Sequence, residues 1–387
     1  MNVTIVTTGR ADYGLLYPLI KELNASDCFD LNVVATGTHL SPLHGNTISH
    51  IQQDGFQVSP VEMTAHGDSE DAICHAIATG LVGFSSVFQK SPPDLIIVLG
   101  DRYELWAICM AAVIHKIPIA HLHGGESTSG AIDESIRHSV TKMSTFHFAS
   151  IPAYAQTIIQ MGENPDRVHV VGALGIDNIK NMPLMNIEEM AEYTSIDFTR
   201  NNVALMTYHP VTLDEYASAQ HQIQVILEVL VQRDLLILVT MPNADTGNNK
   251  IHETIEIYCQ KHPEKFLLIK NLGQRAYLSA MKYAKVMIGN SSSGIIESAS
   301  FQLPVVNIGD RQGGRFKPSN VIDCQCSPES ITAALDKALS VDFHHAIAGI
   351  DNPYGDGNSA KRIVQLLESI DLSDKTRLVK KEFHHRP

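Results

Sequence analysis

Short apolar runs recur along the whole chain, and each run ends near a Gly, Asp, His or Asn residue. In the first half the runs cover residues 3–7, 31–35, 95–99, 117–122 and 168–171. In the second half they cover residues 203–206, 235–239, 266–269, 286–288 and 305–308. Segments of helical length separate them, and continuous apolar runs that alternate with helices are typical of parallel strands covered on both faces. The pattern predicts an α/β fold with two Rossmann-like, doubly wound domains.

The length of 387 residues agrees with two domains of similar size. We expect an N-terminal domain over 1–180, a C-terminal domain over 181–358 and a last segment over 359–387. That last segment should begin with an amphipathic helix, and residues 371–387 are polar and expected to be loosely held. Ligands of open parallel sheets bind beyond the carboxyl ends of the strands, so we expect the two domains to face each other across a cleft that holds the site.

The composition excludes several classes of partner. The net charge of −13 argues against a nucleic acid or an anionic membrane surface. The beginning of the sequence lacks a signal-peptide pattern, and no stretch approaches 18 uninterrupted apolar residues, which predicts a cytoplasmic protein without a membrane partner. The six cysteines are scattered, and Cys324-Gln325-Cys326 has the spacing of neither a zinc site nor a redox pair. We expect no metal.

The stretch Gly289-Asn290-Ser291-Ser292-Ser293-Gly294 follows a buried-type strand and should lead into a helix that opens at Ile295. Backbone N–H groups at a helix N-terminus have no intrahelical partner, and serine hydroxyls add further donors. This geometry predicts a phosphate site. His209, at the end of another strand, should donate a hydrogen bond to the same phosphate, and Glu297 should face ribose hydroxyls one helical turn further on. Arg311 and Arg315, on a glycine-rich loop, suit a diphosphate.

Ionisable residues also follow the strands of the first half. Arg10 stands beside an expected helix N-terminus, without the glycine fingerprint of a dinucleotide site. Asp101 and Arg102 come directly after the apolar run 95–99, where Asp101 could equally cap a helix. So many ionisable groups around one sheet edge favour a functional site.

The next strand ends in His121-Leu122-His123-Gly124-Gly125-Glu126. His121, His123 and Glu126 offer metal-binding atoms, but His-x-His on a strand directs the two rings to opposite faces, which disfavours a metal. Further along, Asp133 with Arg137 and Glu134 with His138 are i,i+4 pairs, for which a surface ion-pair helix is the plainer interpretation. Arg137 is expected to orient a carboxylate rather than to bind ligand directly.

Taken together, these ordered motifs resemble the UDP-N-acetylglucosamine 2-epimerase family over nearly the whole chain. The stretches that carry the resemblance are residues 9–14, 100–104, 121–138, 209–210, 243–247, 289–297, 309–315 and 354–358. His-Gly-Gly-Glu and Ile-Asp-Glu-Ser-Ile-Arg-His are similar to the hydrolysing branch of bacterial sialic acid synthesis. The resemblance implies a GT-B-like fold whose last helix crosses back to the N-terminal domain.

The resemblance also implies the roles of individual residues. UDP would be bound by Arg10, Arg102, His209, Asn243, Ser291, Ser292, Glu297 and Arg311. Asp101, Glu126, Asp133 and Glu134 would surround the sugar, with His39 nearby. Related enzymes carry Glu where this chain has His123, which leaves open which group is the base. No cofactor is implied, and the chain is expected to form a homodimer or homotetramer.

The implied reaction converts UDP-N-acetylglucosamine and water to N-acetylmannosamine and UDP. Anti elimination of UDP would give a 2-acetamidoglucal, which is then hydrated, so the reaction needs proton-transfer groups and a site that stabilises the leaving UDP. The same reaction on UDP-2,4-diacetamido-2,4,6-trideoxyglucose, as in legionaminic acid synthesis, is the nearest alternative. A non-hydrolysing epimerase, a retaining GT-B glycosyltransferase and a nucleotide-sugar-binding regulatory module also remain open.

Overall fold

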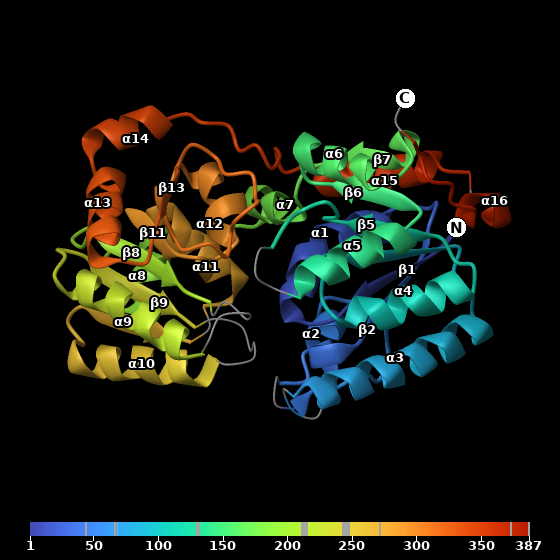
Figure 1. Ribbon diagram of the computed structural model, residues 1–387, viewed down its shortest axis with the longest axis horizontal. Coiled ribbons are helices and arrows are strands. Elements are labelled where there is room, and N and C mark those ends of the chain that lie inside the picture. The colour runs from blue at the N-terminus through green and yellow to red at the C-terminus, as the bar shows by residue number, and fades with distance from the viewer. Residues whose placement is uncertain are drawn as a thin grey trace. The chain divides into compact units, whose positions relative to one another are not determined.

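The computed structural model describes residues 1–42, 45–65, 67, 69–128, 132–209, 216–241, 248–270, 272–371 and 374–385. The chain divides into two compact units. Unit 1 consists of residues 1–126, 132–178 and 354–387, and unit 2 of residues 127–131 and 179–353. Each unit is a parallel sheet covered by helices (Figure 1). The predicted α/β fold with two doubly wound domains is therefore confirmed.

Unit 1 is built on a seven-stranded sheet with the order β3-β2-β1-β4-β5-β6-β7. Its strands are β1 (Asn2–Thr7), β2 (Asp30–Ala35), β3 (Val58–Pro60), β4 (Leu95–Leu99), β5 (Ile119–Leu122), β6 (Phe146–Ala149) and β7 (Val168–Val170). All neighbouring strands are parallel. The order reverses between β1 and β4, so the carboxyl ends of these two strands mark the place where a doubly wound sheet binds its ligand.

Helices cover both faces of this sheet. They are α1 (Arg10–Ala25), η1 (Gly37–Leu40), α2 (Ile48–Gln53), α3 (Glu70–Lys90), α4 (Glu104–Ile114), α5 (Asp133–Met143), α6 (Pro152–Gln160), η3 (Pro165–Arg167), α7 (Leu174–Asn181), α15 (Ser359–Ser369) and α16 (Lys375–Val379). One buried cluster packs α1 and α15 against the sheet, and a second packs α3, α4 and α5 against it. Ile363 and Leu367 of α15 belong to the first cluster, so this late helix completes the core of unit 1.

Unit 2 repeats the architecture with a six-stranded parallel sheet of order β10-β9-β8-β11-β12-β13. Its strands are β8 (Val203–Thr207), β9 (Leu236–Thr240), β10 (Phe266–Ile269), β11 (Val286–Gly289), β12 (Val305–Ile308) and β13 (Val321–Cys324). Its helices are α8 (Ile187–Thr194), α9 (Tyr216–Val231), α10 (Asn248–Lys261), α11 (Gly273–Tyr283), α12 (Ser293–Ile296), η4 (Ser298–Phe301), α13 (Pro328–Ala338) and α14 (Val341–Ile347). The order reverses between β8 and β11.

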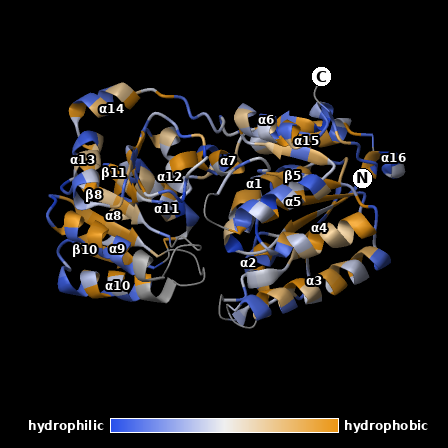
Figure 2. Cartoon of the chain, viewed as in Figure 1, coloured by the Kyte–Doolittle hydropathy of each residue, from blue (hydrophilic) through white to orange (hydrophobic). Residues whose placement is uncertain are grey.

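Hydrophobic residues concentrate along the strands and on the helix faces turned toward them (Figure 2). This is the pattern expected of sheets buried on both faces, and it explains why the apolar runs located ten of the strands. Three strands were not predicted, namely β3, β6 and β13. β3 and β13 are short edge strands with polar residues, and β6 carries His147 in its middle.

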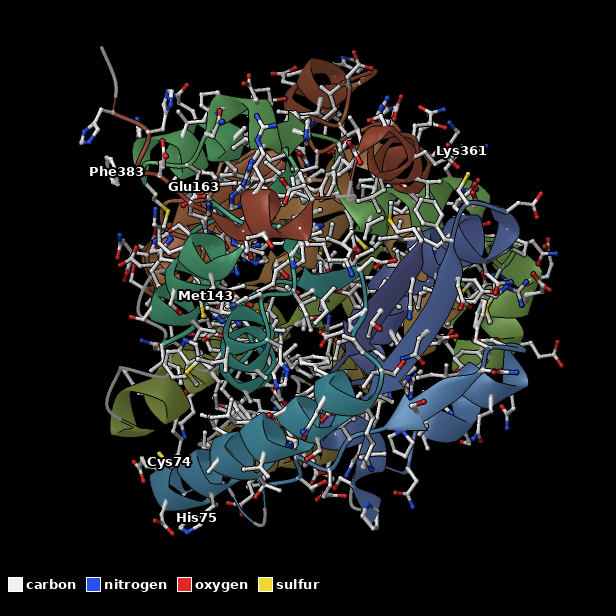
Figure 3. All side chains as sticks on the ribbon, turned by 90° about the vertical axis from the view of Figure 1, so that its right-hand side faces the viewer. Cys74, His75, Met143, Glu163, Lys361 and Phe383 are labelled. Carbon is white, nitrogen blue, oxygen red and sulfur yellow. The ribbon has the colours of Figure 1, made fainter. Side chains whose placement is uncertain are left out.

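The C-terminal tail is not loosely held, contrary to the expectation from its polar sequence. Lys381 Nζ lies 2.6 Å from Glu163 Oε2 and donates hydrogen bonds of 2.7 Å to the carbonyl oxygens of Lys142 and Ser144. The backbone N–H of His384 donates to the Gly162 carbonyl at 2.9 Å. Phe383 and Glu163 mark this region in Figure 3. The tail is therefore pinned to unit 1 by specific polar contacts.

Among the described residues, α3 is long and apolar enough to cross a membrane by length and composition alone. It carries Glu70, Asp71 and Lys90 at its ends, and the Phe84 and Phe88 side chains are buried in the core of unit 1. This combination is typical of a helix that packs on a sheet.

Candidate active site

The last residue of β11 is a glycine that the sheet requires. Gly289 has a φ of +133°, and a Cβ at this position would collide with the Thr207 carbonyl oxygen of β8. The close approach brings the β8 end beside the serine loop. The helix that follows begins at Ser293 rather than at the expected Ile295 and ends after one turn, at Ile296. The phosphate-binding capacity of this loop therefore depends on its serines and their neighbours more than on a long helix.

Asn290 joins the elements around this strand end. Its Oδ1 accepts a 2.7 Å hydrogen bond from the backbone N–H of His209, and its Nδ2 donates to the His209 carbonyl at 2.8 Å. The Asn290 carbonyl accepts hydrogen bonds from Arg311 NH1 at 3.2 Å and from Gln312 Nε2 at 2.8 Å. The structure thus brings the predicted residues His209, Ser291 and Arg311 together around Asn290, a residue to which the sequence analysis gave no role.

His209 is buried, and burial together with the positive charge of Arg311 lowers its pKa to about 3. The imidazole is therefore neutral near pH 7, and its buried Nδ1 has no hydrogen-bond partner within the described part of the chain. A neutral imidazole can donate one hydrogen bond, so the ring suits an oxyanion without adding a full positive charge.

Glu297 directly follows α12, and Ser292, which the resemblance also implied, is the residue before that helix. Burial raises the pKa of Glu297 to about 7, while its hydrogen bond from Ser293 acts in the opposite direction. Tyr277 of α11 is partly buried beside Glu297 and the serine loop, and its hydroxyl lies 3.5 Å from Thr207 Oγ1. Tyr277 and Gln312 line this strand end although the sequence analysis missed both.

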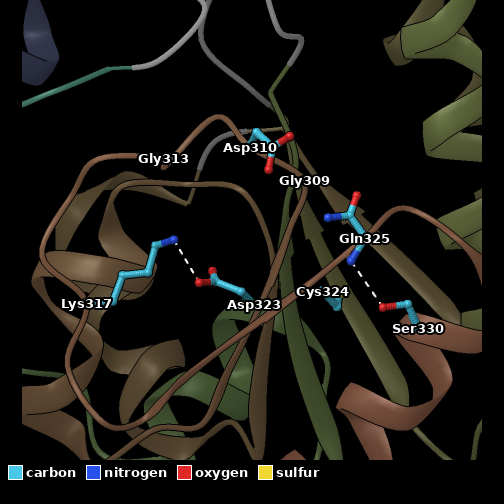
Figure 4. A pocket seen from close by; sticks show the side chains of 8 residues that line it. All are labelled: Gly309, Asp310, Gly313, Lys317, Asp323, Cys324, Gln325 and Ser330. Carbon is cyan, nitrogen blue, oxygen red and sulfur yellow. Dashed lines mark hydrogen bonds and ion pairs between the residues drawn. The ribbon is translucent and has the colours of Figure 1, made fainter.

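The glycine-rich loop after β12 separates its two arginines. Arg311 contacts Asn290, whereas Arg315 donates to the Ser127 carbonyl at 3.0 Å and lies 3.4 Å from Thr128 Oγ1. A cavity of about 240 Å³ lies beside the loop (Figure 4). It is lined by Gly309, Asp310, Gly313, Lys317, Asp323, Cys324, Gln325 and Ser330. Lys317 and Asp323 pair across it at 2.8 Å, so its cation is already neutralised and the cavity does not favour an anion.

In unit 1, Arg10 is the first residue of α1 and is exposed beyond the end of β1. Arg102 follows β4, with its Nε 3.4 Å from Glu104 Oε2. The Glu104 side chain is fully buried, and burial raises its pKa although the nearby Arg102 charge opposes the rise. Burial likewise raises the pKa of Asp12, which accepts a hydrogen bond from Thr8. Two carboxyl groups with raised pKa values, at residues 12 and 104, therefore lie near Arg102.

Asp101 does not cap α4, because its carboxylate forms an ion pair with Arg137 of α5. Arg137 NH1 also lies 3.7 Å from Glu134 Oε2, and Glu134 pairs with His138 at 3.2 Å. The Glu134–His138 pair was predicted. The surface interpretation is wrong for Arg137, because its side chain is only 3 % exposed, whereas its ion pair with Asp101 agrees with the expectation that it orients a carboxylate. Asp133 is the first residue of α5.

His121 of β5 and His123, which directly follows this strand, have separate partners. His121 is fully buried, where its Nε2 donates to the Gly100 carbonyl at 2.8 Å, and burial lowers its pKa to about 3. His123 Nδ1 instead lies 2.7 Å from Glu126 Oε1. The same oxygen accepts a 3.1 Å hydrogen bond from Ser150 Oγ at the end of β6. Glu126 is thus held in place by two donors.

His39 lies in η1 and is fully buried. Its Nε2 is 3.0 Å from Thr7 Oγ1 and its Nδ1 is 2.8 Å from Thr47 Oγ1, so both ring nitrogens have protein partners. The ring holds the loop after β2 against the end of β1, and a substrate contact stays a prediction. Asn243, which the resemblance placed at UDP, lies outside the described residues.

Known proteins resemble this chain over nearly its whole length. The model of the family described as UDP-N-acetylglucosamine 2-epimerase matches residues 21–368. The UDP-N,N'-diacetylbacillosamine 2-epimerase (hydrolyzing) of Legionella pneumophila is 38 % identical over 96 % of both chains. The GDP/UDP-N,N'-diacetylbacillosamine 2-epimerase (hydrolyzing) of Campylobacter jejuni is 38 % identical over 88 % of both. The polysialic acid biosynthesis protein P7 of Escherichia coli is 33 % identical over 95 % of this chain and 93 % of that one.

Among solved structures, the UDP-GlcNAc 2-epimerase from Neisseria meningitidis bound to UDP-GlcNAc superimposes with a TM-score of 0.81. It covers 95 % of this chain and 99 % of its own, at 19 % identity. That likeness supports the GT-B-like fold.

Proposed function

Because the chain belongs to the UDP-N-acetylglucosamine 2-epimerase family, in its hydrolysing branch, we propose that it hydrolyses a UDP-sugar with inversion at C2. The observation that carries the proposal is the set of paired ionisable groups at the adjacent carboxyl ends of β4 and β5. Asp101 is held by Arg137, and Glu126 is held by His123 and Ser150. Removing an unactivated C2 proton and returning one from the opposite face requires such groups to be fixed in place.

The serine loop of unit 2 supports the leaving-group half of the reaction. Departure of UDP places negative charge on the diphosphate, and pre-arranged donors stabilise such charge most effectively. His209, Ser291 and Arg311 gather around Asn290, which holds the strand ends together. We assign these three residues, with Ser292, to the diphosphate, and Glu297 to the ribose. Arg10, Arg102 and Asn243 remain proposed UDP contacts.

The proposed substrate is UDP-2,4-diacetamido-2,4,6-trideoxyglucose, which is the chemical name of UDP-N,N'-diacetylbacillosamine. The support is that two relatives at 38 % identity carry that substrate in their names. The product would then be 2,4-diacetamido-2,4,6-trideoxymannose, a precursor suited to legionaminic acid synthesis. UDP-N-acetylglucosamine, giving N-acetylmannosamine for sialic acid synthesis, is the competing substrate.

Incubation of the pure protein with each UDP-sugar separately, without an acceptor, tests the proposal. We expect release of UDP and the free 2-epimer, with the kcat/KM for the diacetamido sugar at least about 10-fold higher, the effect of one well-recognised substituent. A UDP-linked 2-epimer would identify a non-hydrolysing enzyme. No turnover of either sugar would favour a glycosyltransferase or a binding module and would contradict the proposal.

The proton-transfer groups are tested by single amide variants. We expect Asp101→Asn, Glu126→Gln and Asp133→Asn each to lower kcat by about 100-fold or more, and Glu134→Gln tests the remaining carboxylate of α5. Near-normal turnover in the first three variants would contradict the assignment.

We also propose that the chain forms a homo-oligomer in the cytoplasm. The large apolar side chains of Val82 on α3 and of Met110, Val113 and Ile114 on α4 are exposed. These residues support a homodimer or homotetramer, which light scattering on the purified protein measures directly. A cytoplasmic location agrees with a nucleotide-sugar substrate.

A further inference from the structure

His123 occupies an unusual backbone position at the end of β5. Its N–H still donates to the Phe148 carbonyl of β6 at 3.1 Å, but its φ of +62° lies in the left-handed region. This conformation costs free energy for a residue other than glycine. Such strain is retained mainly where the position of a side chain matters. The turn directs the His123 side chain toward Glu126, three residues further along.

The contacts of Glu126 determine which nitrogen of His123 carries hydrogen. An ionised carboxylate only accepts hydrogen bonds, so the 2.7 Å contact with Glu126 Oε1 requires hydrogen on His123 Nδ1. The 3.1 Å bond from Ser150 fixes the same oxygen. His123 Nε2 is then left with its lone pair, the form in which an imidazole accepts a proton.

Nothing in the described protein uses that lone pair. His123 Nε2 is buried without a hydrogen-bond partner, although the side chain as a whole is 13 % exposed. Buried polar atoms are nearly always paired, so an unpaired one calls for an explanation such as a ligand.

The neighbouring strand places His123 beside the predicted sugar-binding groups. Leu99 of β4 pairs with Leu122 of β5, and the Gly100 N–H donates to the Leu122 carbonyl at 3.0 Å. His123 therefore directly follows the paired Leu122, and Asp101 lies two residues after its partner Leu99 on the adjacent strand. Both belong to the same carboxyl edge of the sheet in unit 1.

We propose that His123 is the base that removes the C2 proton and that Glu126 is its positioning residue. The inference rests on the proposed function and changes the role of Glu126, which then acts through the imidazole. The arrangement resembles other acid–base pairs in which a carboxylate sets the tautomer of a histidine and stabilises the imidazolium that forms.

The elimination of UDP begins with the transfer of a proton to His123. His123 Nε2 takes the C2 proton, the electron pair of the C2–H bond forms the C1=C2 double bond, and the C1–O pair leaves with UDP. In hydration, a group on the opposite sugar face gives a proton to C2 and water adds its hydroxyl to C1. The remaining water proton restores that group, and the imidazolium of His123 returns its proton to solvent.

His123→Asn is the most informative variant, because asparagine tolerates the left-handed backbone conformation. We expect it to lower kcat for UDP release by about 100-fold or more with little change in KM. With UDP present, the same variant should hydrate the synthetic 2-acetamidoglucal of the preferred sugar at a rate within about 5-fold of the wild type, since the base acts only in elimination. A merely structural role would slow both half-reactions equally.

Two further variants sharpen the test. Glu126→Gln should lower kcat for elimination while sparing glucal hydration, because Glu126 takes part in the reaction only through the histidine that it positions. His115→Gln, which removes an imidazole bonded to Ser85 at the far end of α4, should leave both rates unchanged. Normal elimination by His123→Asn, or an equal loss of both half-reactions, overturns the inference. Failure of the wild type to release UDP from either sugar would instead contradict the proposed function.

Discussion

At the scale of single residues, the sequence predicted several positions of the site but not their state. The serine loop and His209 could be located because each follows a continuous apolar run. The contacts of Asn290 and Gln312 depend on neighbours far along the chain, so no local pattern predicts them. His123 was considered as part of an improbable metal site and as a departure from the Glu of related enzymes. Ser150, which shares Glu126 with it, follows a strand that the sequence analysis did not predict.

Glu297 gives a pH prediction at this scale. Burial raises its pKa from 4.5 to about 7, so the unfolded chain ionises first as pH rises. The contribution of this group to stability is therefore fully present below pH 4.5 and is lost between about pH 4.5 and 7. The loss is at most on the order of 3 kcal/mol in unit 2.

Thermal unfolding of the wild type and of Glu297→Gln, followed by calorimetry from pH 4.5 to 8, measures this effect. Glutamine does not ionise, so the stability of the variant relative to the wild type should increase across that range. A constant difference between the two proteins would contradict the raised pKa.

At the scale of elements, strand order and strand ends carry the function. Ten strands were predictable because a sheet buried on both faces demands apolar residues at every position. The strand β6 escaped because His147 interrupts its apolar run, and this histidine is tolerated only through its 3.0 Å contact with Glu163, a tertiary partner. The helix after the serine loop was expected to be longer because no local breaker follows it in the sequence. It ends after one turn, where η4 follows.

The Asn290 contacts join β8, β11 and the loop after β12, so they predict a joint effect on stability and ligand binding. Asn290→Ala leaves the buried backbone N–H and carbonyl groups of His209 unpaired, at a cost of about 1–3 kcal/mol. Because it also releases His209 from the serine loop, while the backbone carbonyl at position 290 can still accept from Arg311, we expect the Kd for UDP to rise at least about 10-fold, or 1.4 kcal/mol. Titration calorimetry with UDP measures the second effect.

Asn320→Ala is the matched control. Asn320 is also fully buried, and its Nδ2 donates to Ser298 Oγ at 2.7 Å and to the Leu303 carbonyl at 2.6 Å, before β13 begins. This variant should lose similar stability but bind UDP within about 2-fold of the wild type. Equal losses of affinity in the two variants would show that Asn290 acts only through general stability.

At the scale of the whole molecule, two similar sheets share one chain, and its C-terminal tail returns to unit 1. The sequence predicted the repetition of the fold, but not the way the tail is held, because its polar residues find specific partners only after folding. Burial alone would raise the pKa of Glu163, but hydrogen bonds from His147, Lys142 and Lys381 lower it to about 2. This carboxylate therefore stabilises unit 1 above pH 4.5, and the contribution is lost as pH falls toward 2.

Removing the tail's contribution to this cluster should weaken unit 1 selectively. Lys381→Met deletes the ion pair with Glu163 and three hydrogen bonds to backbone carbonyls, so we expect a loss of about 1–3 kcal/mol near neutral pH. The single tryptophan, Trp106, lies in α4, and its fluorescence reports the unfolding of unit 1.

Lys375→Met removes a more exposed pair with Asp94 on the same unit and should cost less than about 1 kcal/mol. If the two variants lower the tryptophan-detected stability equally, the tail is held by its surface contacts and the Glu163 cluster is not its anchor.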